Sequence, residues 1–188
     1  MRKIKRIIEK LVFKIFYSTS YPKIAKWYKK KGVSIGYNVN LVNVVIDSRN
    51  YKLIKIGNNV TISNSTILVH DASMSKYLGW TKIAGVTIGS NVFIGYGCTI
   101  LPGINIGNNV IIGAGTVVSK DIPSNSVVVG SKINIVSSFE EFLAKETDSI
   151  KNSVKFEDFK HKSDSDAYLH TVKEKLKDEI GYYKSFDI

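Results

Sequence analysis

The sequence predicts an all-β solenoid, in which short strands and tight turns wind into a parallel β-helix. Three observations carry this prediction. Branched aliphatic residues recur at every sixth position through the middle of the chain, and these are Ile88, Ile94, Ile100, Ile106, Ile112 and Val118. Four of the six are followed directly by glycine, and small residues stand four positions after the aliphatic ones. A period of six fits neither a long helix nor a long strand, but it fits short strands separated by equal bends.

Each residue type in the six-residue repeat has a physical reason. The aliphatic residue points into the narrow interior, and the residue four positions later also points inward but near a corner, where a small side chain fits. Residues of this second kind are Val60, Val92, Cys98, Val110 and Thr116. The corners need unusual backbone dihedral angles, which Gly and Asn adopt more readily than other residues. The pairs Asn58-Asn59, Ser90-Asn91 and Asn108-Asn109 are therefore expected at corners.

The repeat defines a predicted solenoid domain of residues 35–136. It begins near Ile35, its register blurs over residues 43–55, and it resumes at Ile56. Residues 69–85 lose the pattern, which predicts an excursion from the solenoid. From Ile88 the period is unbroken to Val118, and residues 127–129 read as a last strand. Eighteen residues per coil give about five coils, with neighbouring strands about 4.8 Å apart.

Residues 1–34 form a basic arm. Over residues 3–17 the apolar residues recur with helical spacing, which predicts an amphipathic helix whose other face is filled by lysine and arginine. Two interpretations stay open for this helix: it docks on its own solenoid or a neighbouring subunit, or residues 2–17 lie in an anionic membrane surface. A second short helix is expected from Ile24 to Lys31.

Residues 137–188 form a C-terminal extension. Helices are expected over residues 139–143 and 168–180, with a polar loop or linker over residues 146–166 between them. Because the open end of a solenoid must be covered, a helix of this extension is expected to cap it.

Charge and composition exclude several classes of protein. The formal net charge is +11, and residues 1–31 hold eleven Lys or Arg against one Glu. Nucleic acid is not an expected partner, since no aromatic platform or reading helix accompanies the basic arm. No apolar run is long enough to span a membrane, and Glu9, Lys10 and Lys14 interrupt the resemblance of the N-terminus to an export signal. The single cysteine, Cys98, reads as a core residue. We expect a cytoplasmic protein, either free or at the inner face of the membrane.

Residues 56–136 resemble the hexapeptide-repeat O-acetyltransferases. The similarity is to maltose and galactoside acetyltransferases and, more closely, to enzymes that modify capsular polysaccharide or sialic acid. The motifs that carry it are VHDAS at residues 69–73, GWTKI at residues 79–83, and the run IGSNVFIGYGCTILPGINIGNNVIIGAGTVVSKDIPSNSVVVG from Ile88. The resemblance implies a left-handed coil, acetyl-CoA as acyl donor, no metal, a saccharide acceptor and a homotrimer with its sites between subunits.

His70 and Asp71 are the predicted catalytic residues. His70 is the only histidine of the solenoid half, and it lies where the repeat stops and a loop would leave the coil. An imidazole can accept a hydroxyl proton at neutral pH, and in the resembling enzymes this histidine deprotonates the acceptor. Asp71 could orient a histidine, bind an acceptor hydroxyl or cap the loop. Adjacent side chains on a strand point to opposite faces, so the partner of His70 could instead be a backbone carbonyl.

The excursion and the corners supply the predicted binding residues. Tyr77, Trp80 and Lys82 could hold a sugar acceptor by stacking, although a buried hydrophobic patch at a subunit contact would use the same residues.

By resemblance, the Tyr96 N–H would face the thioester oxygen, Phe93 would be a cofactor-binding residue, and Ala114 would contact the pantetheine arm of coenzyme A. Ser119 and Lys120 would lie near the distal end of the cofactor. The family usually places a basic residue after the last strand in the pattern Gly-x-Pro-Ala-Lys/Arg. Here that run reads Gly-Ser-Lys-Ile-Asn from Gly130. Two alternatives follow: Lys132 substitutes for the family's basic residue, or Lys120 serves alone.

Other functions compete with O-acetyl transfer. An amino-sugar N-acetyltransferase would use the same base, but such enzymes often carry an additional N-terminal α/β domain that 34 residues cannot hold. A zinc hydratase needs three converging imidazoles, and the repeats supply only His70. A non-catalytic scaffold would be expected to have unbroken coils, whereas this solenoid is interrupted by a segment that carries a histidine.

Overall fold

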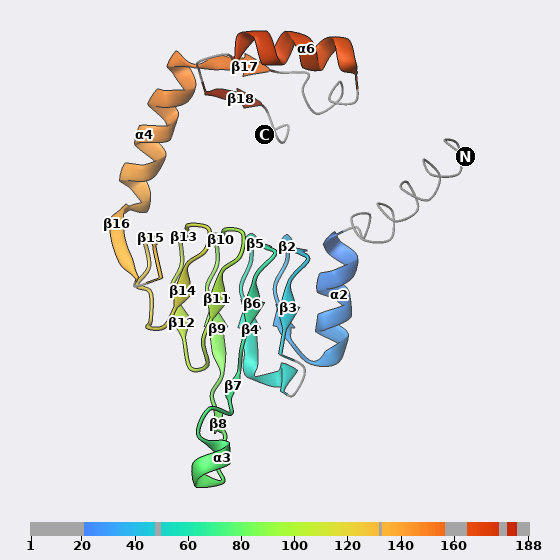
Figure 1. Cartoon of the computed structure of the whole chain (residues 1–188), viewed down its shortest axis with the longest axis vertical. Helices are drawn as coiled ribbons and strands as arrows, with labels where there is room; N and C mark the ends of the chain where they lie inside the picture. The colour runs from blue at the N-terminus through green and yellow to red at the C-terminus, as the bar shows by residue number, and fades with distance from the viewer. Residues whose placement is uncertain (1–20, 48–49, 132, 157–164, 177–179, 184–188) are drawn as a thin grey trace, which may run out of the picture. The chain divides into compact units, whose positions relative to one another are not determined.

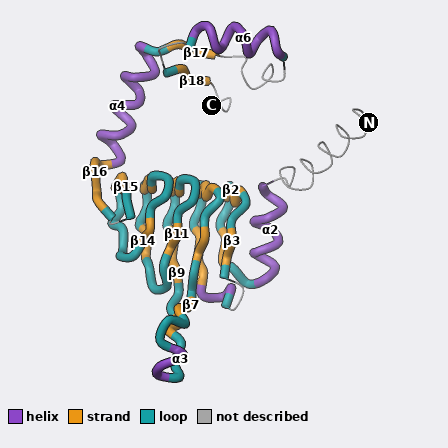
Figure 2. The backbone as a smooth tube through the Cα atoms, viewed as in Figure 1, coloured by secondary structure: helices purple, strands orange, loops and turns teal. Residues whose placement is uncertain are grey.

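Three parallel sheets form a left-handed β-helix. The six-residue period predicts the β-helix, and the family resemblance implies its left-handed coil. The computed structural model describes residues 21–47, 50–131, 133–156, 165–176 and 180–183. The first sheet contains β1 (Ser34–Ile35), β4 (Ile54–Ile56), β9 (Val86–Ile88) and β12 (Asn105–Ile106). The second contains β2 (Val39–Val42), β5 (Val60–Ser63), β10 (Val92–Ile94), β13 (Val110–Ile112) and β15 (Ser126–Val129). The third contains β3 (Val45–Ile46), β6 (Thr66–Ile67), β11 (Thr99–Ile100) and β14 (Val117–Val118). Figure 2 shows these short strands alternating with turns.

The repeat residues stack on one another from coil to coil. Ile56 pairs with Ile88, Ile94 with Ile112, and Ile100 with Val118, and each of these residues is almost wholly buried. The smaller corner residues are buried as well, so the interior is one continuous apolar column. The predicted division of inward positions into large and small residues is therefore confirmed.

One corner of the coil is held by a ladder of asparagines. All five members of the ladder have a positive φ, between 52° and 61°: Asn38, Asn59, Asn91, Asn109 and Asn125. Each of the first four side-chain amides donates a hydrogen bond to the amide oxygen of the next member, over 2.8–3.1 Å. Asparagine is suited to this place because it tolerates the left-handed conformation, and its amide both donates and accepts.

Glycine is needed where successive coils approach most closely. A Cβ added to Gly89 would lie only 2.5 Å from the carbonyl oxygen of Gly107 in the next coil. A side chain there would push the two coils apart, which explains why glycine follows so many of the inward aliphatic residues.

The solenoid begins at β1 and β2, as predicted. The register predicted to blur over residues 43–55 is in fact regular over part of that segment. Val45 and Ile46 pair with Thr66 and Ile67, so residues 45–46 belong to the regular third sheet. The first coil is longer than the regular coil of the six-residue repeat: Asn38 and Asn59 are 21 positions apart, whereas Asn91 and Asn109 are 18 apart. A short 3-10 helix, η1 (Tyr51–Leu53), contributes to the longer corner.

Helix α2 (Tyr21–Lys31) covers the first coil, as Figure 1 shows. This confirms the short helix predicted from Ile24 to Lys31. Ala25 and Tyr28 are buried against the coil, and the Tyr28 hydroxyl bonds with the open edge beside β3. This hydroxyl donates to the Val44 carbonyl oxygen over 3.0 Å and accepts from the Ile46 N–H over 3.3 Å. The helix therefore satisfies backbone groups that no neighbouring coil can reach. The predicted helix over residues 3–17 lies outside the described residues.

The other end of the solenoid carries a strand that the sequence pattern does not predict. Strand β16 (Asn134–Ser138) turns back and pairs antiparallel with β15, which was expected to be the last strand. The chain divides into two units between residues 139 and 140, so α2 and β16 belong to the same unit as the coils.

The second unit contains α4 (Phe139–Asn152), β17 (Val154–Phe156), α6 (Asp166–Lys175) and β18 (Gly181–Tyr183). Strands β17 and β18 pair in parallel, and the Ser165 hydroxyl caps α6 by accepting from the Tyr168 N–H. The predicted loop over residues 146–166 is wrong at residues 146–152, which continue α4, and at the strand β17. Seven of the eight residues from Lys145 to Asn152 are polar or charged, so the sequence pattern does not reveal that they form a helix with an exposed face. None of the described helices is long and apolar enough to cross a membrane.

We expect Tyr28→Phe to lower the free energy of unfolding by about 1–3 kcal/mol, because the Val44 carbonyl and the Ile46 N–H would lose a buried partner. Urea unfolding followed by circular dichroism measures this loss. Tyr37→Phe is the matched control, since Tyr37 is 66% exposed and its replacement should change little. Equal midpoints for the two variants would contradict the role assigned to the Tyr28 hydroxyl.

Candidate active site

His70 lies at the neck of the predicted excursion. The inward-facing Val69 is the last residue of the coil, and its carbonyl oxygen accepts from the Ala84 N–H over 3.0 Å, which closes the neck. Beyond it, β7 (His70–Asp71) pairs antiparallel with β8 (Lys82–Ile83), and α3 (Ser75–Leu78) lies at the tip. Figure 1 shows this hairpin, in green, leaving the stacked coils. The histidine is thus fixed to the rigid column at the base of a projecting loop.

Asp47 is the partner of His70, and sequence reasoning missed it. The Asp47 carboxylate makes a short contact with Nδ1 of His70 through Oδ2, and the same oxygen accepts from the Val69 N–H over 3.2 Å. The Asp47 side chain is 5% exposed and the His70 ring 28% exposed. A buried carboxylate on Nδ1 favours a proton on that nitrogen and leaves Nε2 with a free lone pair.

A signal for Asp47 exists in the sequence once the coil length is known. Ile46 pairs with Ile67 and Ile67 with Ile100, so Asp47 occupies the same column as Leu68 and Leu101. A carboxylate among leucines marks an unusual position. The 21-residue length of the first coil conceals this position in the sequence. If every coil had eighteen residues, Asp47 would not be aligned with the residues that precede His70.

Asp71 is placed differently from His70. Its carboxylate accepts a hydrogen bond from the Ser73 N–H over 2.9 Å and caps the start of the loop. The backbone N–H and hydroxyl of Ser73 lower the pKa of Asp71, with smaller contributions from the charges of Lys82 and His70. The carboxylate is exposed, and it is Asp47 that contacts the imidazole.

The predicted acceptor residues all lie on the excursion. Tyr77 is on α3, Trp80 follows the left-handed Gly79 that ends α3, and Lys82 is on β8 opposite Asp71. Tyr77 and Trp80 are 81% and 76% exposed. The structure therefore brings these three residues and His70 onto one projecting hairpin.

The predicted donor residues lie on adjacent coils. Phe93 is an outward-facing residue of β10, and Tyr96 follows at the next corner. A Cβ on Gly95 would lie 2.7 Å from the backbone nitrogen of Ala114, and the Tyr96 carbonyl oxygen accepts from the Gly115 N–H over 2.8 Å. Tyr96 and Ala114 are thus brought together. Ser119 and Lys120 are exposed beyond β14, and Lys132 lies outside the described residues.

A buried serine fixes the peptide that precedes Tyr96. The Ser65 hydroxyl lies 2.9 Å from the Gly95 carbonyl oxygen and 2.7 Å from the Ser63 carbonyl oxygen, which share its one proton, and Ser65 is 2% exposed. In a trans peptide the C=O and N–H bonds point in opposite directions, and the described chain contains no cis peptide. Because the Gly95 oxygen points toward buried Ser65, the Tyr96 N–H points away from the interior.

Other chemistries find less support in this geometry. Burial raises the pKa of the Cys98 thiol, which also donates to the Gly113 carbonyl oxygen, so Cys98 is a packed core residue. Among the described residues, no group of three His, Cys, Asp or Glu side chains could hold a metal ion.

Comparison with known proteins places the chain among transferases. The model of the bacterial transferase hexapeptide family, described as six repeats, matches residues 85–120. Protein CapG of Staphylococcus aureus is 38% identical over 125 residues, which cover 62% of this chain and 72% of CapG.

One solved structure agrees with this placement. A galactoside acetyltransferase in complex with coenzyme A is 26% identical, with a TM-score of 0.50 over 70% of this chain and 78% of its own. A maltose O-acetyltransferase from Clostridium difficile 630 is 30% identical, with a TM-score of 0.46 over 68% of this chain and 80% of its own.

Nitrogen-15 NMR of the imidazole tests the assignment of the His70 tautomer. We expect the neutral ring to carry its proton on Nδ1, because Asp47 accepts it there. Asp47→Leu should abolish this preference while keeping the fold, since leucine occupies the same column in the next two coils. The exposed His170 serves as internal reference in both spectra. A neutral His70 protonated on Nε2 in the unmodified protein would contradict the assignment.

Proposed function

The chain belongs to the bacterial hexapeptide-repeat transferases and is an acyltransferase, and from this premise we propose that it moves an acetyl group from acetyl-CoA to a sugar hydroxyl. The proposed acceptor is a bacterial surface glycan, such as capsule, exopolysaccharide or lipopolysaccharide, or its precursor. The observation that carries the proposal is the contact between His70 and buried Asp47 at the neck of the excursion. A scaffold would have no use for a buried carboxylate placed against a partly exposed imidazole.

His70 acts as the general base in the proposed mechanism. Its Nε2 takes the proton of the acceptor hydroxyl while the hydroxyl oxygen attacks the thioester carbonyl carbon. The tetrahedral intermediate then collapses, the carbon–sulfur bond breaks, and the imidazolium returns its proton to the departing thiolate. Asp47 orients the ring and stabilises its positive charge, because its carboxylate already contacts Nδ1.

The Tyr96 N–H is the proposed donor to the oxyanion. Its direction away from the core follows from the Ser65 hydrogen bond to the preceding carbonyl, so the donor is fixed before substrate binds. A preorganised donor is worth more than one that must reorient during the reaction. Phe93 and Ala114 would contact the arm of acetyl-CoA, and Ser119, Lys120 and Lys132 its distal end.

The excursion would bind the acceptor. Tyr77 and Trp80 offer exposed aromatic faces to a sugar ring, while Lys82 and Asp71 offer charged groups for its hydroxyls. We assign the same hairpin a second role in a homotrimer, where it would reach a groove beside the neighbouring subunit. The large exposed area of Tyr77, Leu78, Trp80 and Ile83 supports this assignment, because a neighbour would cover it.

The function is tested by mixing the protein with acetyl-CoA and a panel of saccharides and following thiol release. We expect His70→Ala to lower the rate by at least about 10²-fold, because general-base catalysis contributes a factor of this size or more. His170→Ala in the second unit is the control and should leave the rate unchanged. Both variants should keep the circular dichroism of the parent protein. A His70→Ala variant with the parent rate would remove His70 from the mechanism.

Substitutions of Asp47 and Asp71 should change different kinetic constants. Asp47→Asn should lower kcat by about 10²-fold or more with little change in the acceptor KM, because it disturbs the ring that takes the proton. Asp71→Asn should raise the acceptor KM and leave kcat nearly unchanged, because Asp71 is proposed to bind the acceptor. The reverse pattern would assign the orienting role to Asp71 instead.

A further inference from the structure

Helix α2 turns three lysines and a tryptophan outward on a single face. Ala25 and Tyr28 are buried against the first coil, while Lys23, Lys26, Trp27 and Lys30 are exposed. These four residues follow the spacing i, i+3, i+4 and i+7, which places them on one side of a helix. The side that faces away from the solenoid is therefore a basic stripe with an aromatic residue at its centre.

The positive charge of this face is not neutralised within the described structure. The helix has five lysines and no acidic residue, and none of these lysines forms an ion pair with a described residue. The described acidic residues of the same unit are engaged elsewhere: Asp47 with His70, Asp71 with Ser73, and Asp121 with the Asn105 N–H. An anionic surface is the chemical complement of such a face.

Trp27 is partly exposed at the surface, and two tyrosine rings pack against it. It is 49% exposed, and its ring lies edge-on to Tyr28 and Tyr51 with centroid distances of 4.8 and 6.3 Å. The Lys31 ammonium lies 5.4 Å from the ring centroid. Tryptophan is favoured where one side of a residue meets apolar material and the other meets water, which is the situation at a lipid headgroup layer.

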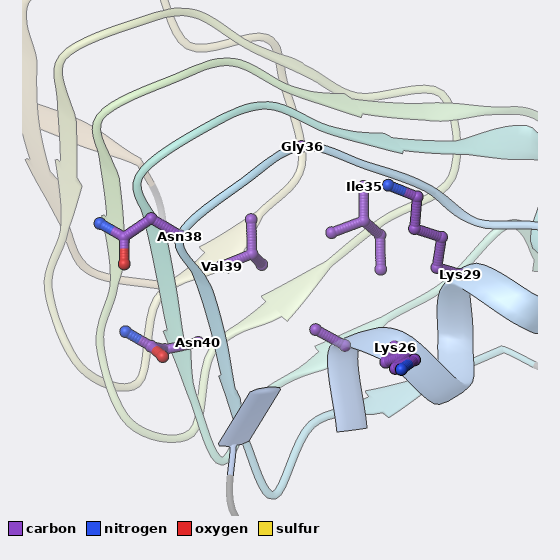
Figure 3. Close-up of a pocket in the computed structure, with 8 residues that line it drawn as sticks. Lys26, Lys29, Ile35, Gly36, Asn38, Val39 and Asn40 are labelled. Atoms are coloured by element: carbon purple, nitrogen blue, oxygen red, sulfur yellow. The ribbon is translucent and has the colours of Figure 1, made fainter. Parts of the chain in front are cut away.

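Two hollows flank the helix and widen the basic surface. One, of about 420 Å³, is lined by Lys23, Ile24, Trp27, Tyr28, Asn43 and Val44. The other, of about 390 Å³, has Lys26 and Lys29 on the helix side and Asn38 and Asn40 opposite, as Figure 3 shows. Each hollow combines lysine and asparagine side chains with apolar ones, which suits a lipid whose phosphate meets the lysine while its carbon chain meets the apolar lining.

We propose that α2 lays its outward face on an anionic membrane surface, with Trp27 entering the headgroup layer and Lys23, Lys26 and Lys30 contacting lipid phosphates. This inference does not depend on acetyl transfer. A soluble polyanion would pair with the lysines, but it would not require a tryptophan at the centre of their stripe. The combination of basic residues around an aromatic one on a convex helix favours a lipid surface.

The fluorescence of Trp27 reports on this contact directly. The chain has two tryptophans, so the full-length Trp80→Phe variant leaves Trp27 as the only one. We expect its emission to shift to shorter wavelength with vesicles of phosphatidylcholine and phosphatidylserine, and brominated lipids to quench it. Pure phosphatidylcholine vesicles should give neither effect. An unchanged spectrum with the anionic vesicles would overturn the proposal, as would a shift produced by a soluble polyanion without lipid quenching.

Vesicle co-sedimentation measures the contribution of the lysines. Lys23→Gln/Lys26→Gln/Lys30→Gln should weaken partitioning onto anionic vesicles by about 10²-fold, because each lysine near such a surface contributes roughly a factor of five. Lys145→Gln/Lys151→Gln/Lys173→Gln removes the same charge from exposed lysines of the second unit and should bind as the parent does.

Residues 1–20 are present in every variant, so their own charge cancels in the comparison. Equal partitioning of the two triple variants would overturn the role of α2. Acetyl transfer to a soluble acceptor should stay unchanged in both, which separates this proposal from the proposed function.

Discussion

The close stacking of successive coils is the constraint on which the rest of this structure depends. Aliphatic side chains fill the column at fixed intervals, and corner residues must adopt backbone angles that let each coil lie directly on the last. Asparagine meets this requirement at one corner, where each amide bonds to the next. Because the column is rigid, every residue attached to it has a defined position relative to residues a whole coil away.

The candidate site uses this rigidity across coils. His70 and Asp47 are 23 positions apart, yet the pairing of β3 with β6 brings them into contact. Ser65 and Gly95 are 30 positions apart and are joined in the same manner. Local sequence supplies the side chains, and the stacking supplies the distances between them. Such a site needs little reorganisation when substrates bind, because its supporting groups are already hydrogen-bonded.

The features that could be predicted from sequence are those that repeat. The period of six predicts the sheets, the inward residues and the corner asparagines, and the break in the period points to His70. Asp47 could not be found in the same manner, because its role depends on a first coil of unusual length. Strand β16 and the continuation of α4 escaped prediction because their stabilising contacts come from tertiary pairing or from a helix with few apolar residues. Lys132, offered in place of a missing family residue, lies outside the described residues.

The hydrogen bonds of the Tyr28 hydroxyl also affect whether copies of the protein can join end to end. A β-helix presents at each end a set of strand edges that could accept the matching end of another copy, and repeated joining would produce a filament. By occupying backbone groups of the first coil, Tyr28 and its helix prevent growth from that end. A coiled architecture that could in principle extend without limit is thereby kept to a finite length.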